Sequence, residues 1–225
     1  MKSTWMKWSA LPVVVLTAGS VALAQDQPSS GSQQPAPAAT PAPAEKPKPT
    51  VAQRKENQQD RIANGVQSGQ LTAGETANLE KKEAAINKET AADRAANGGK
   101  LTGAEKKQVN RQQNQVSKQI YADKHNANTA HYGNNKVGQR RENQQDRIAQ
   151  GIKSGQLKPG ETAKLENQQK GINKQVAADR KANGGTLTAS EKQQINKEQN
   201  RASKNIYHKK HNAKTQSQAQ AQPKQ

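Results

Sequence analysis

The chain has 225 residues, a formal net charge of +18 at pH 7, and a hydrophobic content of only 30%. Because globular domains average about 45–50% apolar residues, this composition excludes a large hydrophobic core. The chain has no Cys, which excludes a disulfide scaffold, a Cys-ligated metal and a thiol nucleophile. The 36 Lys and Arg residues outnumber the 18 Asp and Glu residues, and this excess favours partners that carry negative charge.

Residues 1–24 have the features of a secretory signal peptide. Lys2 and Lys7 precede a short apolar stretch, and Ala22-Leu23-Ala24 fits the small-x-small rule for cleavage. The stretch is shorter than the about 20 apolar residues that a membrane-spanning helix needs, which disfavours an anchor. We therefore predict an exported protein, periplasmic or extracellular, without a membrane span after cleavage. Cleavage would remove two lysines and no acid, leaving a net charge of +16.

Two segments are predicted to be disordered. Residues 25–50 are rich in Pro, Ala, Gln and Ser, and Pro both blocks helix formation and removes backbone donors. We read this segment as an extended linker rather than as a strand packed on a domain. The polar tail 214–225 has too few apolar residues to fold on its own.

Between these segments the sequence is duplicated. ENQQDRIA at 56–63 recurs unchanged at 142–149, and the offset of 86 residues then continues without a gap. About three-fifths of the aligned positions are identical, which indicates a true internal repeat. The duplication predicts one module at 51–128, a polar linker at 129–138 and a second module at 139–213.

Each module contains two helix-start signals. Thr72, Thr102 and Thr188 are each followed three residues later by a Glu, the spacing of a capping box. The fourth site lacks the Thr, but Pro159 there occupies the first helical position, where Pro is tolerated. The predicted cap residues are Thr72, Glu75, Thr102, Glu105, Glu161, Thr188 and Glu191. Gly65 or Gly69 and the pair Gly98-Gly99 are predicted to end the preceding helices.

The apolar residues after each cap follow a helical period. Leu79, Ile86 and Thr90 are spaced seven and four, as are Val109, Val116 and Ile120. No segment alternates with the period of a strand. We predict an all-α fold of two tandem three-helix modules, built as helix hairpins with short Gly loops, whose first helix spans about 53–67. The predicted core of the first module is Ile62, Val66, Leu71, Leu79, Ile86, Leu101, Val109, Val116, Ile120 and Tyr121, with Tyr207 as the core edge of the second.

The basic residues fall opposite these stripes. On the third helix of the first module, three cations project about 160–200° from Val109, and their counterparts recur in the second module. Such a face is also typical of an ordinary solvated helix, but the charge of the whole chain favours contact with polyanions. The candidate contact residues are Lys81, Lys88, Lys107, Arg111, Lys118, Lys174, Lys197 and Lys204.

The four loops of the form Gly-x-Leu-x-x-x-Glu resemble the second half of an EF-hand calcium loop. This resemblance implies a helix–loop–helix pair in which Leu71 meets Leu101 and Leu157 meets Leu187. The first ligand position carries Arg in two of the four loops, and the third position carries Val, Ile or Ala in all four, which offer no side-chain oxygen to a hard cation. Helix capping therefore explains the Glu residues better than calcium does, and we predict no metal and no cofactor.

The paired units SGQLTxxE and NGGxLTxxE resemble those of a recurring kind of uncharacterised secreted bacterial helical-repeat protein, rich in Gln and Asn. The resemblance spans both modules and implies no activity. The four His residues, including His208 and His211 beside two lysines, fit solvent-exposed or helix-terminal positions better than a metal site. No nucleophile, phosphate loop or paired carboxylate is evident, so we expect no enzyme activity.

Three functional hypotheses remain open. The first is electrostatic, non-specific binding of an anionic polymer or surface: cell envelope, polysaccharide or nucleic acid. The second is a hydrophilin-like stress protectant, favoured by the mean hydropathy of −1.18 and expected to be largely unfolded. The third is a degenerate EF-hand-like interaction module without strong calcium binding.

Overall fold

The computed structural model describes residues 47–212, which form six α-helices and belong to one compact unit. The helices are α1 (Val51–Gln67), α2 (Ala73–Ala96), α3 (Gly103–Lys124), α4 (Lys136–Lys153), α5 (Pro159–Ala182) and α6 (Ala189–Lys210). The described range contains no strand, so the all-α prediction is confirmed. The predicted signal peptide, nearly all of the predicted linker 25–50 and the predicted tail 214–225 lie outside the described residues.

The predicted helix starts are confirmed. Thr72, Thr102 and Thr188 are N-caps, and each forms a complete capping box with the Glu three residues on. α5 begins at Pro159, where Glu161 accepts a 3.3 Å hydrogen bond from the Lys158 N–H in place of the missing box. A fourth box, Thr50 with Gln53, starts α1 two residues before the predicted position.

The carboxylates of these caps are held in their charged form. The backbone N–H groups of Thr102 and Thr188 donate to Glu105 and Glu191, and these hydrogen bonds lower the pKa of both acids. At Glu75, burial opposes the shift, but hydrogen bonds from Thr72 lower the pKa below its usual value. The recurring geometry of the three boxes shows that these Glu residues act as helix caps, and each also accepts a hydrogen bond from a nearby Asn side chain.

Short loops join the helices within each repeat. Gly69, Gly98 and Gly99 adopt positive φ angles of 71°, 60° and 89°, which end α1 and α2 as predicted. The connection between the repeats is longer, and α4 begins at Lys136, so its first three residues belong to the segment predicted as a linker. None of the helices in the described range is long and apolar enough to cross a membrane.

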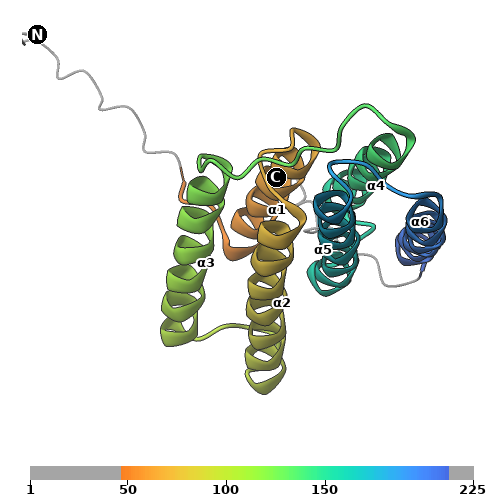
Figure 1. Ribbon diagram of the computed structural model, residues 1–225. Coiled ribbons are helices and arrows are strands. Elements are labelled where there is room, and N and C mark those ends of the chain that lie inside the picture. Colours follow the sequence, from red (N-terminus) through yellow and green to blue (C-terminus); the bar gives the residue numbers. More distant parts are fainter. Residues whose placement is uncertain (1–46, 213–225) are drawn as a thin grey trace, which may run out of the picture. The chain divides into compact units, whose positions relative to one another are not determined.

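The two repeats pack against each other through equivalent helices. α2 contacts α5 and α1 contacts α4, whereas α3 and α6 pack only within their own repeats, on opposite outer sides (Figure 1). Gly74 faces the Lys170 side chain, and its counterpart Gly160 faces Ala84, which is the counterpart of Lys170. Because each contact recurs with the partners exchanged, the repeats are related by an internal pseudo-two-fold axis.

The main hydrophobic cluster is shared by both repeats. It joins Ile62, Leu79 and Ile120 to Ile148 and Leu165, while a smaller cluster around Ile195 lies in the second repeat. Every residue predicted for the core of the first module is buried except one. Tyr121 is 62% exposed, so its assignment to the core was wrong, as was that of Tyr207.

A buried glycine permits the close packing at the end of α1. A Cβ added at Gly65 would lie 2.7 Å from Leu71 Cγ and Cδ1, and one at Gly151 would lie 2.7 Å from Leu157 Cγ. We expect Gly65→Ala to lower the free energy of unfolding by about 1–3 kcal/mol, measured by urea denaturation, because the Leu71 side chain must move.

A matched control exists in α5. Gly171 has no neighbour for an added Cβ, and its counterpart in the first repeat is Ala85. Gly171→Ala should therefore raise the free energy of unfolding by about 0.5–1 kcal/mol through helix propensity. Destabilisation by both variants would show that the loss at Gly65 does not come from the Leu71 contact.

Candidate polyanion-binding surface

The surface charge of the described residues is strongly segregated. Among the acids between 47 and 212, only Glu56 and Glu142 have exposed side chains; the others are buried or half-buried. Twenty Lys and Arg side chains in the same range are exposed. The one ion pair within this range joins Lys209 to Glu161 at 3.8 Å. The fold therefore presents a surface whose positive charge is largely uncompensated by its own carboxylates.

All eight predicted contact residues lie on this surface. The side chains of Lys81 and Lys88 are exposed on α2, and that of Lys174 is exposed on α5. The remaining five are exposed on the two outer helices: Lys107, Arg111 and Lys118 on α3, Lys197 and Lys204 on α6. The structure does not gather them into one cluster, because α3 and α6 lie on opposite sides (Figure 1).

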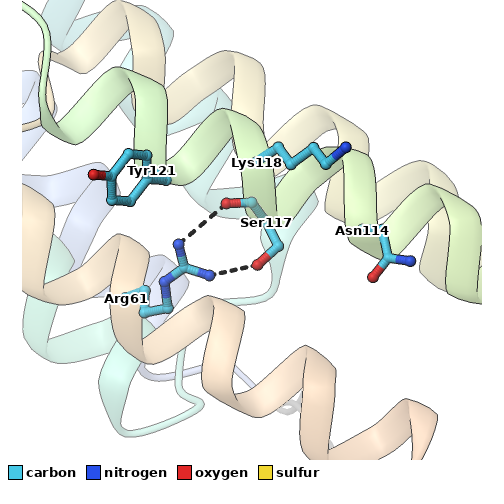
Figure 2. A pocket seen from close by; sticks show the side chains of 5 residues that line it. All are labelled: Arg61, Asn114, Ser117, Lys118 and Tyr121. Carbon is cyan, nitrogen blue, oxygen red and sulfur yellow. Dashed lines mark hydrogen bonds between the residues drawn. The ribbon is translucent and has the colours of Figure 1, made fainter. Parts of the chain in front are cut away.

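Arginines that the sequence analysis did not single out extend the basic surface between α1 and α3. Arg61 donates to Ser117 Oγ at 2.5 Å and to the Ser117 carbonyl at 3.1 Å (Figure 2). Two helical turns earlier on α1, Arg54 donates to Asn110 at 3.2 Å and also to Asn114. All of these partners are neutral, so the hydrogen bonds fix the guanidinium groups without cancelling their charge.

The second repeat reproduces this arrangement between α4 and α6. Arg147 donates to Ser203 Oγ at 2.6 Å, and Arg140 donates to Asn196 and Asn200 at 3.1 and 2.6 Å. The spacing of these arginines was visible in the sequence: the two in each repeat are seven residues apart, and both pairs are related by the repeat offset of 86 residues. Its meaning depended on the packing of α1 on α3, which the sequence alone did not specify.

Two surface pockets, one in each repeat, share some of their lining positions. One is lined by Arg61, Asn114, Ser117, Lys118 and Tyr121 (Figure 2). The other, on α6, is lined by Lys197, Asn200, Arg201 and Lys204. Asn200 and Lys204 are the repeat counterparts of Asn114 and Lys118. Three predicted contact residues, Lys118, Lys197 and Lys204, therefore line pockets.

The two exposed tyrosines border these basic positions. Tyr121 stacks on His125 with ring centroids 4.2 Å apart, and Tyr207 stacks on His211 at the same distance. Each imidazole Nδ1 also lies 2.7–2.8 Å from the carbonyl oxygen of its tyrosine. Tyr121 follows Ser117 and Lys118 by four and three residues, a spacing that places it on their face of the helix instead of in the apolar stripe.

The interior contains a cluster of acids that sequence analysis missed. Glu80 and Glu166 are fully buried on α2 and α5, and burial raises the pKa of each to about 8. Glu83 is also buried, and burial raises its pKa to about 7 although Lys55 lowers it. Gln59 and Gln145 donate to Glu80 and Glu166 at 3.2 and 3.0 Å. Within residues 47–212 no group of acids and histidines is arranged to hold a metal ion.

The paired-loop arrangement implied by the calcium-loop resemblance is not present. Leu71 precedes α2 and Leu101 follows it, so the 24 residues of that helix, about 36 Å in length, separate the two loops. Leu157 and Leu187 belong to different hydrophobic clusters. EF-hand loops pair side by side, whereas here they lie at opposite ends of one long helix.

Comparisons with models of known protein families, with curated proteins and with solved structures found no match.

Proposed function

We propose that the protein is an exported, non-enzymatic helical repeat protein that binds anionic polymers or surfaces electrostatically. The observation that carries this proposal is the excess of positive surface charge: in residues 47–212, twenty basic residues are exposed and ten partly exposed, against two exposed and ten partly exposed acidic ones. Such a surface attracts phosphate, sulfate or carboxylate polymers by counterion release, without reading their sequence. The export component rests on the features of residues 1–24 in the sequence.

The buried cores favour this proposal over the protectant hypothesis. A hydrophilin-like protectant is expected to be a coil in dilute buffer, whereas residues 47–212 bury aliphatic side chains from both repeats in one cluster. Cooperative loss of helix on heating, followed by far-UV circular dichroism, is the result expected for the folded unit. A coil spectrum at room temperature would instead support the protectant.

Retention on heparin and on DNA across a salt gradient tests the binding. Because physiological ionic strength, about 0.15 M, already screens isolated surface charges, a weak non-specific contact would elute there. The wild type should elute well above it, because many cations contact the polymer at once. Substituting Gln at Lys107, Arg111, Lys118, Lys197 and Lys204 should shift elution to lower salt. Each cation lost from contact should reduce the log–log salt slope by about 0.7–0.9.

A control of opposite sign uses the two exposed acids. Glu56→Gln combined with Glu142→Gln removes negative charge without touching the proposed contacts, so this variant should elute at equal or higher salt. Elution of the wild type near physiological salt would contradict the proposal. So would unchanged retention after loss of the five cations.

A further inference from the structure

The fold leaves two of its three tyrosine rings on the surface although it has few large residues to bury. Tyr121 and Tyr207 remain 62% and 55% exposed, while smaller side chains such as Val116 and Ala202 fill the interior of the same helices. Burying a tyrosine ring would stabilise a small core considerably, yet the ring is exposed at both of these equivalent positions. An exposed aromatic ring that recurs beside fixed cations is typical of a stacking platform.

The groups around each ring supply the remaining contacts of such a platform. In the first repeat the Arg61 guanidinium is held by Ser117, and Lys118 is exposed at the same pocket. Asn114 is exposed and accepts from Arg54 through Oδ1, which leaves its Nδ2 group available as a donor. In the second repeat, Arg147, Lys204 and Asn200 are the sequence counterparts, and the pocket there is lined by Asn200 and Lys204 but not by Arg147 or Tyr207.

We propose that the surfaces around Tyr121 and Tyr207 are twin sites for single-stranded nucleic acid, with a base stacked on the ring face turned away from His125 or His211 and the neighbouring phosphates on the adjacent cations. The proposal rests on the polyanion-binding function and specifies its substrate class. Base stacking on an aromatic side chain tolerates any sequence, because every base has a π-face. The adjacent Arg and Lys side chains meet the phosphate charge.

Charge and ring chemistry together favour this occupant over the alternatives. A sulfated or carboxylated polysaccharide needs the cations but has no planar base for the ring. Duplex DNA keeps its bases inside the helix, where a tyrosine on the surface of α3 cannot stack on them. A flexible single strand offers both groups at once. The pseudo-two-fold relation of the repeats predicts two equivalent sites per chain.

Binding of a fluorescently labelled oligothymidylate of eight residues to the full chain, followed by anisotropy, tests the proposal. The wild type should bind two oligonucleotides per chain. Tyr121→Ala and Tyr207→Ala should each weaken one site by about tenfold or more, the loss expected for one stacked base. Tyr121→Phe and Tyr207→Phe retain the ring and should bind as the wild type does.

Heparin retention of the same variants separates this proposal from the general one. The double Ala variant should elute with the wild type, because no charge has changed. If the wild type binds heparin but not oligothymidylate, or if the double Ala variant binds oligothymidylate normally, the stacking sites are wrong and polyanion binding stands. An equal loss on both ligands would also overturn the stacking role. If the wild type binds neither ligand, both proposals fail.

Discussion

Raising the pH from 5 to 9 is expected to lower the free energy of unfolding of this protein by several kcal/mol. Burial raises the pKa of Glu80 and Glu166 to about 8 and that of Glu83 to about 7, from 4.5. Between pH 4.5 and 8 the folded chain therefore keeps protons that the unfolded chain releases. When the folded state binds more protons, the free energy of unfolding falls as the pH rises.

The surroundings of these acids explain why they hold their protons. Glu80 and Glu166 receive one amide donor each, from Gln59 and Gln145, and each keeps a buried Oε1 atom without a partner. The negative charge of Glu166 further raises the pKa of Glu80, whereas Lys55 is the cation that opposes it. An ionised pair in this interior would lack sufficient hydrogen bonds and cations to offset its desolvation.

The capping carboxylates set the acid limit of this stability. The pKa values of Glu75, Glu105 and Glu191 are lowered from 4.5, so these groups stabilise the fold above about pH 4.5 and lose that contribution as the pH falls further. Stability should consequently be greatest near pH 5. Most proteins instead lose stability in mild acid because their paired carboxylates become protonated.

Urea denaturation at pH 5, 7 and 9, followed by circular dichroism, measures the profile. Glu80→Gln combined with Glu166→Gln removes two of the titrating groups and should flatten the decline above pH 5. Glu56→Gln, on an exposed acid, should leave the slope unchanged. A wild-type free energy of unfolding that is constant or rises between pH 5 and 9 would contradict the assigned protonation.

The sequence allowed the helices and their apolar contacts to be predicted, because those depend on local spacing. Thr72 with Glu75 specifies a helix start through groups three residues apart, and Leu79 with Ile86 specifies one buried stripe. Tyr121 was placed wrongly because it adjoins Ile120. A rotation of about 100° per residue separates the two, and that places the ring with Ser117 and Lys118.

Only some of the buried polar residues could be predicted from local spacing. Gln113 lies between Val109 and Val116 in the stripe of α3, so its burial was detectable from spacing. The burial of Glu80 and Glu83 was not, because it depends on α5 covering α2, and pairing of the repeats is a tertiary event. The basic pockets share this dependence, since the position of Arg61 against Ser117 requires α1 to pack on α3.

The two repeats differ at a buried position of α2 and α5. Gln169 occupies the position equivalent to Glu83, and its Nε2 donates to Gln144 Oε1 at 3.1 Å. In the first repeat the corresponding acceptor, Gln58 Oε1, is buried without a partner, as are both carboxylate oxygens of Glu83. An ionised Glu83 has no hydrogen to donate to Gln58, so the first repeat lacks the bond that the second one makes.

Glu83→Gln should therefore raise the free energy of unfolding by about 2 kcal/mol at pH 8, by supplying the missing amide donor and removing a buried charge. The gain should shrink at pH 5, where protonated Glu83 carries a hydroxyl that can itself donate. The reciprocal Gln169→Glu should lower the free energy of unfolding at pH 8 by a similar amount, because it breaks the Gln144 bond and buries an acid.

Lys55 provides the check on this interpretation. It is the cation whose charge lowers the pKa of Glu83, and its counterpart in the second repeat is Arg141, which donates to Asn173 at 2.6 Å. If the Lys55–Glu83 attraction outweighs the desolvation of both groups, Glu83→Gln will destabilise the protein at pH 8 and the gain will change sign. Urea denaturation of both reciprocal variants at pH 5 and 8 distinguishes the two balances, because only the hydrogen-bond account predicts opposite signs for the two substitutions.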